Sequence, residues 1–107
     1  MSRKLKFTLV FAPEALNHLD TIDRKYHGLI ERVIEEQLTH TPELETRNRK
    51  PLEKPAPYEA TWELRLGPNN RFRVFYEVKP QEQAVWILAI GLKEGNRLLI
   101  AGKEIER

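Results

Sequence analysis

The chain has 107 residues, of which 40% are hydrophobic and 32% are charged, with a formal net charge of +2. This length fits a single domain over residues 1–107, and the composition excludes an intrinsically disordered or membrane-embedded protein. The absence of cysteine excludes disulfides, zinc thiolate sites and thiol nucleophiles, and it fits a reducing cytoplasm. No apolar run approaches the length of a membrane span, so we expect no membrane partner.

The N-terminal part of the sequence predicts one strand and two helices. Apolar side chains alternate over residues 4–11, as is typical of a strand. Apolar residues then recur at helical spacing from Pro13, which suits a first helical turn, with a pause at 23–25. Pro42 ends the second helix, because a residue that precedes proline avoids the helical conformation. We expect the two helices to form an antiparallel hairpin.

The C-terminal part predicts three strands. Residues 43–59 contain three prolines and little periodicity, so we expect a loop or an extended arm there. Beyond it the apolar period is two, which predicts strands over 60–66 and 71–78 around a GPNN turn. Residues 84–92 are nearly all apolar, as in a central strand that is buried on both faces. The mixed segment that follows could hold a short strand at 98–101 or a frayed tail.

The order β-α-α-β-β-β predicts an α+β domain, with the helical hairpin packed on one face of a mostly antiparallel sheet. The other face is left for solvent or for a ligand. Residues 47–73 contain seven bases and three acids, whereas residues 14–36 contain three bases and six acids. This asymmetry favours a polyanionic partner for the basic half. A solvated surface without a partner fits the same distribution equally well.

Arginines gather on the face of the sheet that points away from the helices. The apolar side chains of the two hairpin strands must share the helix-facing side, which leaves two registers. One register pairs Arg65 with Arg73, and the other pairs Arg65 with Arg71. Either way Glu63 lies within the cluster, and two arginines face each other at a cost of up to about 1 kcal/mol. Three arginines with one glutamate fit a phosphate site, and the alternative is a hydrated face that Glu63 and Glu77 partly neutralise.

Four segments, taken in order, resemble the RelE/ParE superfamily of bacterial toxins: KPL at 50–52, WELRLG at 62–67, RFRVFYEV at 71–78 and AIGLKEG at 89–95. The resemblance runs nearly the whole chain and implies a RelE-like fold. It implies the toxin of a type II toxin–antitoxin module, with a cognate antitoxin as partner in a hetero-oligomer. RelE-like members enter the ribosomal A site and cut mRNA with the 2′-hydroxyl as nucleophile, without a metal or other cofactor. ParE-like members instead poison DNA gyrase.

The resemblance also implies roles for individual residues. Arg73 matches the most characteristic arginine of the family, which is expected to hold the scissile phosphate. Arg65 matches a basic position on the preceding strand, and Lys93 falls where RelE-like members often have a basic residue after the central strand. Glu63 takes a position that is basic in some members, and it is the one carboxylate placed to act as a general base. Further contacts to RNA phosphates are expected from the remaining basic residues of this half, which are Arg71, Arg47, Arg49, Lys50 and Lys54.

The C-terminal segment departs from the family. Many RelE-like nucleases have a tyrosine or histidine there, but this chain has Leu98, Leu99 and Ile100. We expect these three residues to form an apolar edge strand that contacts the antitoxin. Tyr58 is a candidate substitute for the missing acid–base group, and the histidines, all in the helical half, are expected to be structural.

Three functions stay open on the sequence alone. The arginine cluster favours a ribosome-dependent mRNA endonuclease that inhibits translation. The missing C-terminal tyrosine or histidine favours a ParE-like gyrase inhibitor. A decayed toxin that only binds its antitoxin is the third reading.

Overall fold

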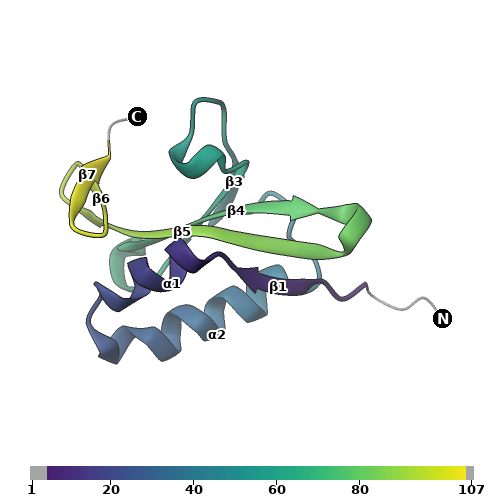
Figure 1. Ribbon diagram of the computed structural model, residues 1–107, viewed down its shortest axis with the longest axis horizontal. Coiled ribbons are helices and arrows are strands. Elements are labelled where there is room, and N and C mark those ends of the chain that lie inside the picture. Colours follow the sequence, from purple (N-terminus) through teal and green to yellow (C-terminus); the bar gives the residue numbers. More distant parts are fainter. Residues whose placement is uncertain (1–4, 106–107) are drawn as a thin grey trace.

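The computed structural model describes residues 5–105 (Figure 1). In chain order its elements are β1 (Thr8–Phe11), α1 (Pro13–Asp20), α2 (His27–Leu38), β2 (Arg49–Pro51), β3 (Trp62–Leu66), β4 (Phe72–Lys79), β5 (Ala84–Glu94), β6 (Arg97–Ile100) and β7 (Lys103–Ile105). Short 3-10 helices occur at Arg24–Tyr26, Pro57–Glu59, Pro68–Asn70 and Pro80–Glu82. No helix within the described residues is long and apolar enough to cross a membrane.

All of these strands join one sheet. Its order is β2-β3-β4-β5-β6-β7 with antiparallel neighbours, and β1 pairs in parallel with β5. The long strand β5 is central, because β4 runs along one side of it while β1 and β6 share the other side. Both helices lie on the same face of the sheet (Figure 1). The predicted α+β architecture is confirmed. β6 corresponds to the short strand considered at 98–101, and the short strands β2 and β7 extend the predicted order.

The helices pack on the sheet through apolar residues at helical spacing. Pro13 stands in the first turn of α1, where a missing N–H costs nothing. In α2, Ile30, Ile34 and Leu38 recur every four residues and are fully buried. They share one apolar core with helix-facing residues of the sheet, among them Leu64. Burial of side chains of this size stabilises the fold by roughly 1.5–3 kcal/mol each.

Two buried polar side chains of the sheet form hydrogen bonds with the end of α2 and the segment that follows it. The Tyr76 hydroxyl donates a 2.8 Å hydrogen bond to the Pro42 carbonyl oxygen, and burial raises the pKa of Tyr76. Arg49 of β2 is only 5% exposed, and its Nη1 donates to the carbonyl oxygens of Gln37 (2.8 Å) and Thr41. The prediction that Arg49 binds RNA is therefore corrected, because its guanidinium is buried on the helix side and holds backbone carbonyls.

The face of the sheet opposite the helices is only partly open. The β6–β7 hairpin and the segment between β2 and β3 both rise over this face (Figure 1). They enclose a second, smaller core that contains Phe75, Leu98 and Ile100. Leu98 is 7% exposed and Ile100 is 2% exposed, and β7 pairs along β6. The expected apolar edge at residues 98–100 is therefore not exposed, and Leu99 is half-buried as well.

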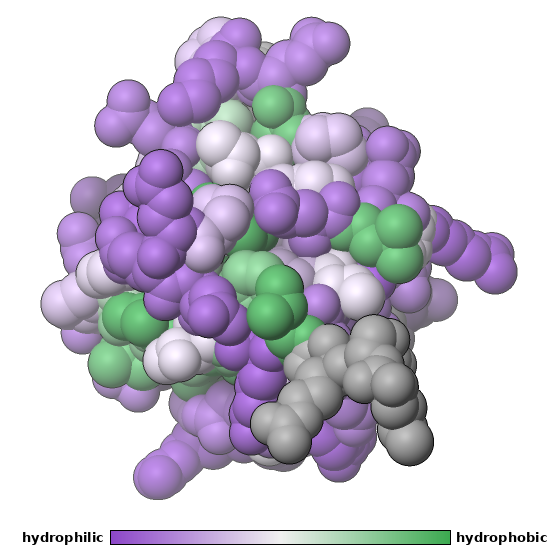
Figure 2. Space-filling view, turned by 90° about the vertical axis from the view of Figure 1, so that its right-hand side faces the viewer, coloured by the Kyte–Doolittle hydropathy of each residue, from purple (hydrophilic) through white to green (hydrophobic). Residues whose placement is uncertain are grey.

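The end of the molecule near the N-terminus has an ordinary polar surface. Figure 2 shows this end, where hydrophilic residues predominate and hydrophobic ones form small separate groups. Scattered apolar residues of this kind are normal on a protein surface. The distinctive chemistry lies instead at the other end of the sheet, where the hairpin folds over it.

Gly91 lets the hairpin approach β5. A Cβ atom at this position would lie 2.7 Å from the Leu99 carbonyl oxygen and 2.9 Å from Cγ1 of Ile100. We predict that Gly91→Ala lowers the free energy of unfolding by about 1–3 kcal/mol, since β6 must shift to accommodate the methyl group. Urea denaturation measures this change.

Gly28 in α2 supplies the matched control, because a Cβ atom there would meet nothing within 4 Å. Gly28→Ala should raise stability by up to about 1 kcal/mol, as expected when alanine replaces glycine in a helix. Equal stability of Gly91→Ala and the wild type would contradict the close packing of β6 on β5.

Candidate nucleic-acid interface

Basic side chains from three neighbouring strands border one cavity on the outer face of the sheet. Arg65 of β3, Arg73 of β4 and Lys93 of β5 line a cavity of about 520 Å³, which we call the cationic cavity. Its other wall comes from the β6–β7 hairpin and the turn before it, through Asn96, Leu98, Glu104 and Ile105. This volume lies within the usual range of small-ligand sites.

Strand register brings these cations together. Arg65 pairs with Arg73 across β3 and β4, and Arg73 pairs with Gly91 across β4 and β5. Lys93, two residues beyond Gly91, falls on the same face because side chains alternate along a strand. The observed register is one of the two that the sequence allowed. The predicted residues Arg65, Arg73 and Lys93 therefore lie around a single space.

The cations differ in exposure. Arg73 is 5% exposed, whereas the Arg65 side chain is 34% exposed and Lys93 is exposed. Arg65 directly opposite Arg73 is a pairing of like charges, which costs up to about 1 kcal/mol. A strand pair keeps such a cost when another interaction offsets it or when function requires it.

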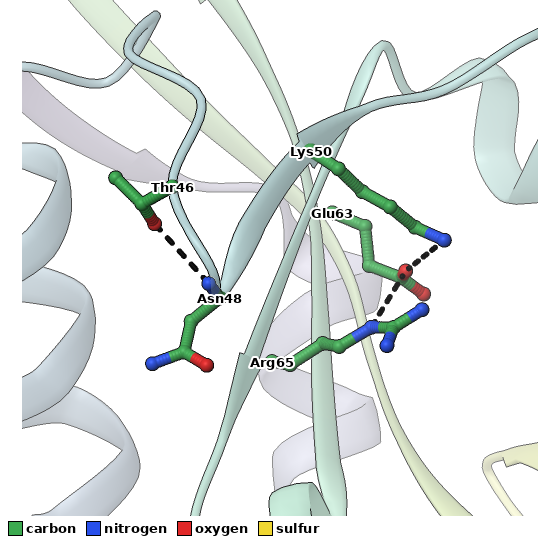
Figure 3. Close-up of polar contacts among 5 residues, drawn as sticks. All are labelled: Thr46, Asn48, Lys50, Glu63 and Arg65. Carbon is green, nitrogen blue, oxygen red and sulfur yellow. Dashed lines mark hydrogen bonds and ion pairs between the residues drawn. The ribbon is translucent and has the colours of Figure 1, made fainter.

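Glu63 offsets the repulsion between Arg65 and Arg73. Its side chain has no solvent exposure, and its Oε1 lies 3.5 Å from Nε of Arg65 and 3.8 Å from Nζ of Lys50. Figure 3 shows this carboxylate between the two cations, with Lys50 on β2 and Arg65 on β3. A buried carboxylate in two ion pairs cannot reach a substrate proton. The geometry therefore favours Glu63 as the residue that positions Arg65 rather than as the predicted base.

A second cavity adjoins the first. Arg73 and Lys93 also border a space of about 420 Å³ that Pro68, Asn69, Arg71 and Gly95 complete. The Lys93 N–H donates a 2.7 Å hydrogen bond to the Arg71 carbonyl oxygen, which fixes the backbone of Arg71 beside Lys93. The predicted phosphate ligand Arg71 thus meets the other cations in this second cavity.

The basic segment at residues 47–54 does not reach these cavities directly. Arg47 and Lys54 are exposed but border neither cavity, and Lys50 reaches the site only through Glu63. The Thr46 hydroxyl accepts a 3.2 Å hydrogen bond from the Asn48 N–H, so the chain turns tightly just before β2 (Figure 3). The arm is anchored to the sheet edge at this point.

The hairpin wall is the part of the site that sequence reasoning missed. Asn96, Glu104 and Ile105 lie in a mixed segment without a clear period. Oε1 of Glu104 lies 3.8 Å from Nη1 of Arg97, and both residues are exposed. The signal available in the sequence was the pair of turn glycines, Gly95 and Gly102, which flank the short apolar strand.

A family model for the ParE toxin of the type II toxin–antitoxin system parDE matches residues 9–96, which is most of the chain. The chain belongs to the ParE toxin family. It is therefore the toxin component of a type II system, within the RelE/ParE superfamily that the sequence motifs resemble. No protein of curated function matches it by sequence.

The fold of this toxin is also that of a solved relative. The toxin–antitoxin complex RelBE2 from Mycobacterium tuberculosis contains a chain with a TM-score of 0.69 and 20% sequence identity. The match covers 87% of this chain and 98% of the other. At this identity the likeness shows the fold alone.

His18 of α1 contacts the segment between β2 and β3, which lies on the opposite side of the sheet. It lies beside β5 at Ile90, between the residues that pair with β1 and those that pair with β6. The Ile90 N–H donates to Nδ1 of His18 (3.3 Å), and Nε2 lies 3.2 Å from the Tyr58 hydroxyl. Because a backbone N–H can only donate, Nδ1 is unprotonated and the imidazole proton is on Nε2. Tyr58 is thus engaged by His18, and it borders neither cavity.

Protonation of His18 should loosen this link. Burial lowers the pKa of His18, and the nearby Glu14 carboxylate opposes part of this change. The folded state therefore binds the proton less readily than the unfolded chain, whose histidine titrates near 6.5. We predict that the contribution of His18 to stability is complete above this pH and is lost as the pH falls through it towards the folded pKa.

Thermal or urea unfolding between about pH 7.5 and about pH 5 tests this prediction against His18→Asn, whose side-chain oxygen can accept from Ile90 without titrating. The wild type should lose more stability than the variant over this interval. Parallel pH profiles would show that His18 is not the group responsible.

Proposed function

We propose that this toxin is a ribosome-dependent mRNA endonuclease that inhibits translation. The observation that carries the proposal is the convergence of Arg65, Arg73 and Lys93 on one cavity. Guanidinium groups bind phosphate oxygens through paired hydrogen bonds, and a largely buried one such as Arg73 holds a fixed position. The cavity is thus suited to a phosphodiester that gains negative charge during a reaction.

The reaction proposed is an internal transesterification of RNA. The 2′-oxygen forms a bond to phosphorus while the bond to the 5′-oxygen breaks, which leaves a 2′,3′-cyclic phosphate and a 5′-hydroxyl end. Arg65 and Arg73 would stabilise the charge that develops on the phosphoryl oxygens. Neither can take up the 2′ proton, because arginine stays protonated in proteins.

Neither of the residues that the sequence suggested for proton transfer is available for it. Glu63 is buried in its ion pairs, and Tyr58 lies elsewhere. We propose that the ammonium group of Lys93 donates a proton to the departing 5′-oxygen, since this residue is exposed and borders both cavities. A water molecule would take up the 2′ proton. The ribosome would position the mRNA, which places the activity in the cytoplasm.

An antitoxin partner is part of the proposal. The solved relative is a toxin–antitoxin complex, and the family model describes the toxin of a paired system. We propose that a cognate antitoxin binds this toxin in a hetero-oligomer and neutralises it. With Leu98 and Ile100 buried, the proposed docking edges are β2 and β7, the outer strands of the sheet order.

The second candidate function is inhibition of DNA gyrase. The matching family model is that of ParE rather than RelE toxins. The described residues that border the cationic cavity also include no tyrosine or histidine. A decayed toxin that only binds its antitoxin would share both features.

Lys93→Ala tests the proposed function without disturbing the core, because this side chain is exposed. Induced expression of the wild type should arrest growth and cut translated mRNA. We predict that Lys93→Ala and Arg73→Ala each slow cleavage by about 100-fold or more, the usual effect of removing one group that stabilises the transition state. Mapping the 5′ ends of transcripts after induction measures the cleavage.

Arg32→Ala is the matched control, since Arg32 is an exposed base on α2, on the opposite side of the sheet. It should keep full toxicity. Intact transcripts together with blocked supercoiling by purified gyrase would support the ParE-like alternative. Normal growth together with tight antitoxin binding would identify a decayed toxin.

A further inference from the structure

Two adjoining cavities share the same two cations. Arg73 and Lys93 border both the cationic cavity and the second cavity, and the Lys93 N–H donates a hydrogen bond to the Arg71 carbonyl oxygen. A ligand held at Arg73 therefore has a space on either side. A single phosphate would fill only a small part of the combined volume of about 520 Å³ and about 420 Å³.

The two cavities differ in chemistry. The cationic cavity has an apolar wall from Leu98 and Ile105 opposite its arginines, and Asn96 also lines it. Cations on one side and apolar surface on the other suit a phosphorylated nucleoside, whose base packs against aliphatic side chains and whose phosphate pairs with the cations. An amide can both donate to and accept from the polar edge of a base.

The second cavity has no comparable apolar wall. It is bordered by Arg71, Arg73 and Lys93 together with turn residues. The Arg71 guanidinium lies 6.0 Å from the centre of the Tyr26 ring and 5.9 Å from that of Phe72, which holds it at the end of the sheet. This arrangement suits a charged phosphate group rather than a base.

We propose that the two cavities bind consecutive units of one single-stranded RNA. The cationic cavity takes a nucleoside with its phosphate at Arg73, and the second cavity takes the next phosphate at Arg71. This inference rests on the proposed function and specifies its substrate as a strand that continues past the reacting phosphate. Single-stranded rather than double-stranded RNA fits, because the base must leave its stack to enter the cationic cavity.

Binding of short nucleotides that cannot be cleaved tests the arrangement. The probes are a 2′-O-methyluridine 3′-monophosphate and the corresponding dinucleotide with one further phosphate, titrated by calorimetry or NMR. In the wild type the second phosphate should raise affinity by about tenfold, as a charge-assisted contact does. In Arg71→Ala this gain should vanish while affinity for the monophosphate stays unchanged. Lys93→Ala should weaken both probes, and Arg32→Ala neither.

The base is tested separately with a 2-O-methylribose phosphate that lacks uracil. It should bind several-fold more weakly than the monophosphate. The proposal is overturned if the second phosphate gives no gain, if Arg71→Ala weakens both probes alike, or if the base makes no difference. Tighter binding of the matching DNA dinucleotide would overturn the assignment to RNA.

These outcomes are independent of cleavage. A protein that shows the two-cavity pattern but cuts no transcript would contradict the proposed endonuclease and leave the binding site intact. A protein that cuts transcripts without the pattern would contradict this inference alone.

Discussion

The pairing of Arg65 with Arg73 across β3 and β4 is the constraint on which the outer face depends. It places like charges opposite each other, at a cost that a strand pair normally avoids. The buried carboxylate of Glu63 offsets that cost through ion pairs with Arg65 and Lys50. Removing Glu63 would leave three cations close together around a buried site. The carboxylate thus holds Arg65 and Lys50 in place.

The cavity itself depends on a second feature, the close approach of β6 to β5. Gly91 allows this approach, because any larger residue would collide with the backbone of Leu99. The β6–β7 hairpin can then fold over the outer face and bury Leu98 and Ile100. Without the hairpin, Arg65, Arg73 and Lys93 would lie on a flat surface in full contact with water. The wall excludes part of the solvent, which would strengthen the proposed attraction of these cations for a phosphate.

Periodicity predicted the parts of the fold whose residues interact locally. The strand at the N-terminus, both helices and the three long strands follow from apolar spacing, and the arginine cluster follows from the alternation of β3 and β4. Strands of three residues such as β2 and β7 are too short to show a period. Their positions depend on pairing with another strand, which is β3 for β2 and β6 for β7.

The roles of individual polar residues were harder to predict, because their partners come from other segments of the chain. Arg49 stands in a basic run and looked like a phosphate ligand, but its partners are carbonyl oxygens at the end of α2. Glu63 looked like an accessible base, although Lys50 comes from another strand to cover it. His18 looked structural, and it does bond to Ile90, 72 residues away. None of these contacts has a local signature in the sequence.

The salt dependence of RNA binding tests the central claim, that the outer face is a phosphate site built from a few fixed cations. Binding of a short single-stranded RNA is followed by fluorescence anisotropy over a series of KCl concentrations. The logarithm of the affinity should fall linearly with the logarithm of the salt concentration, and Lys93→Ala should make this slope shallower by about 0.7, the value for one phosphate contact on a single strand. Arg32→Ala should leave the slope unchanged. Equal slopes for the wild type and Lys93→Ala would contradict the account.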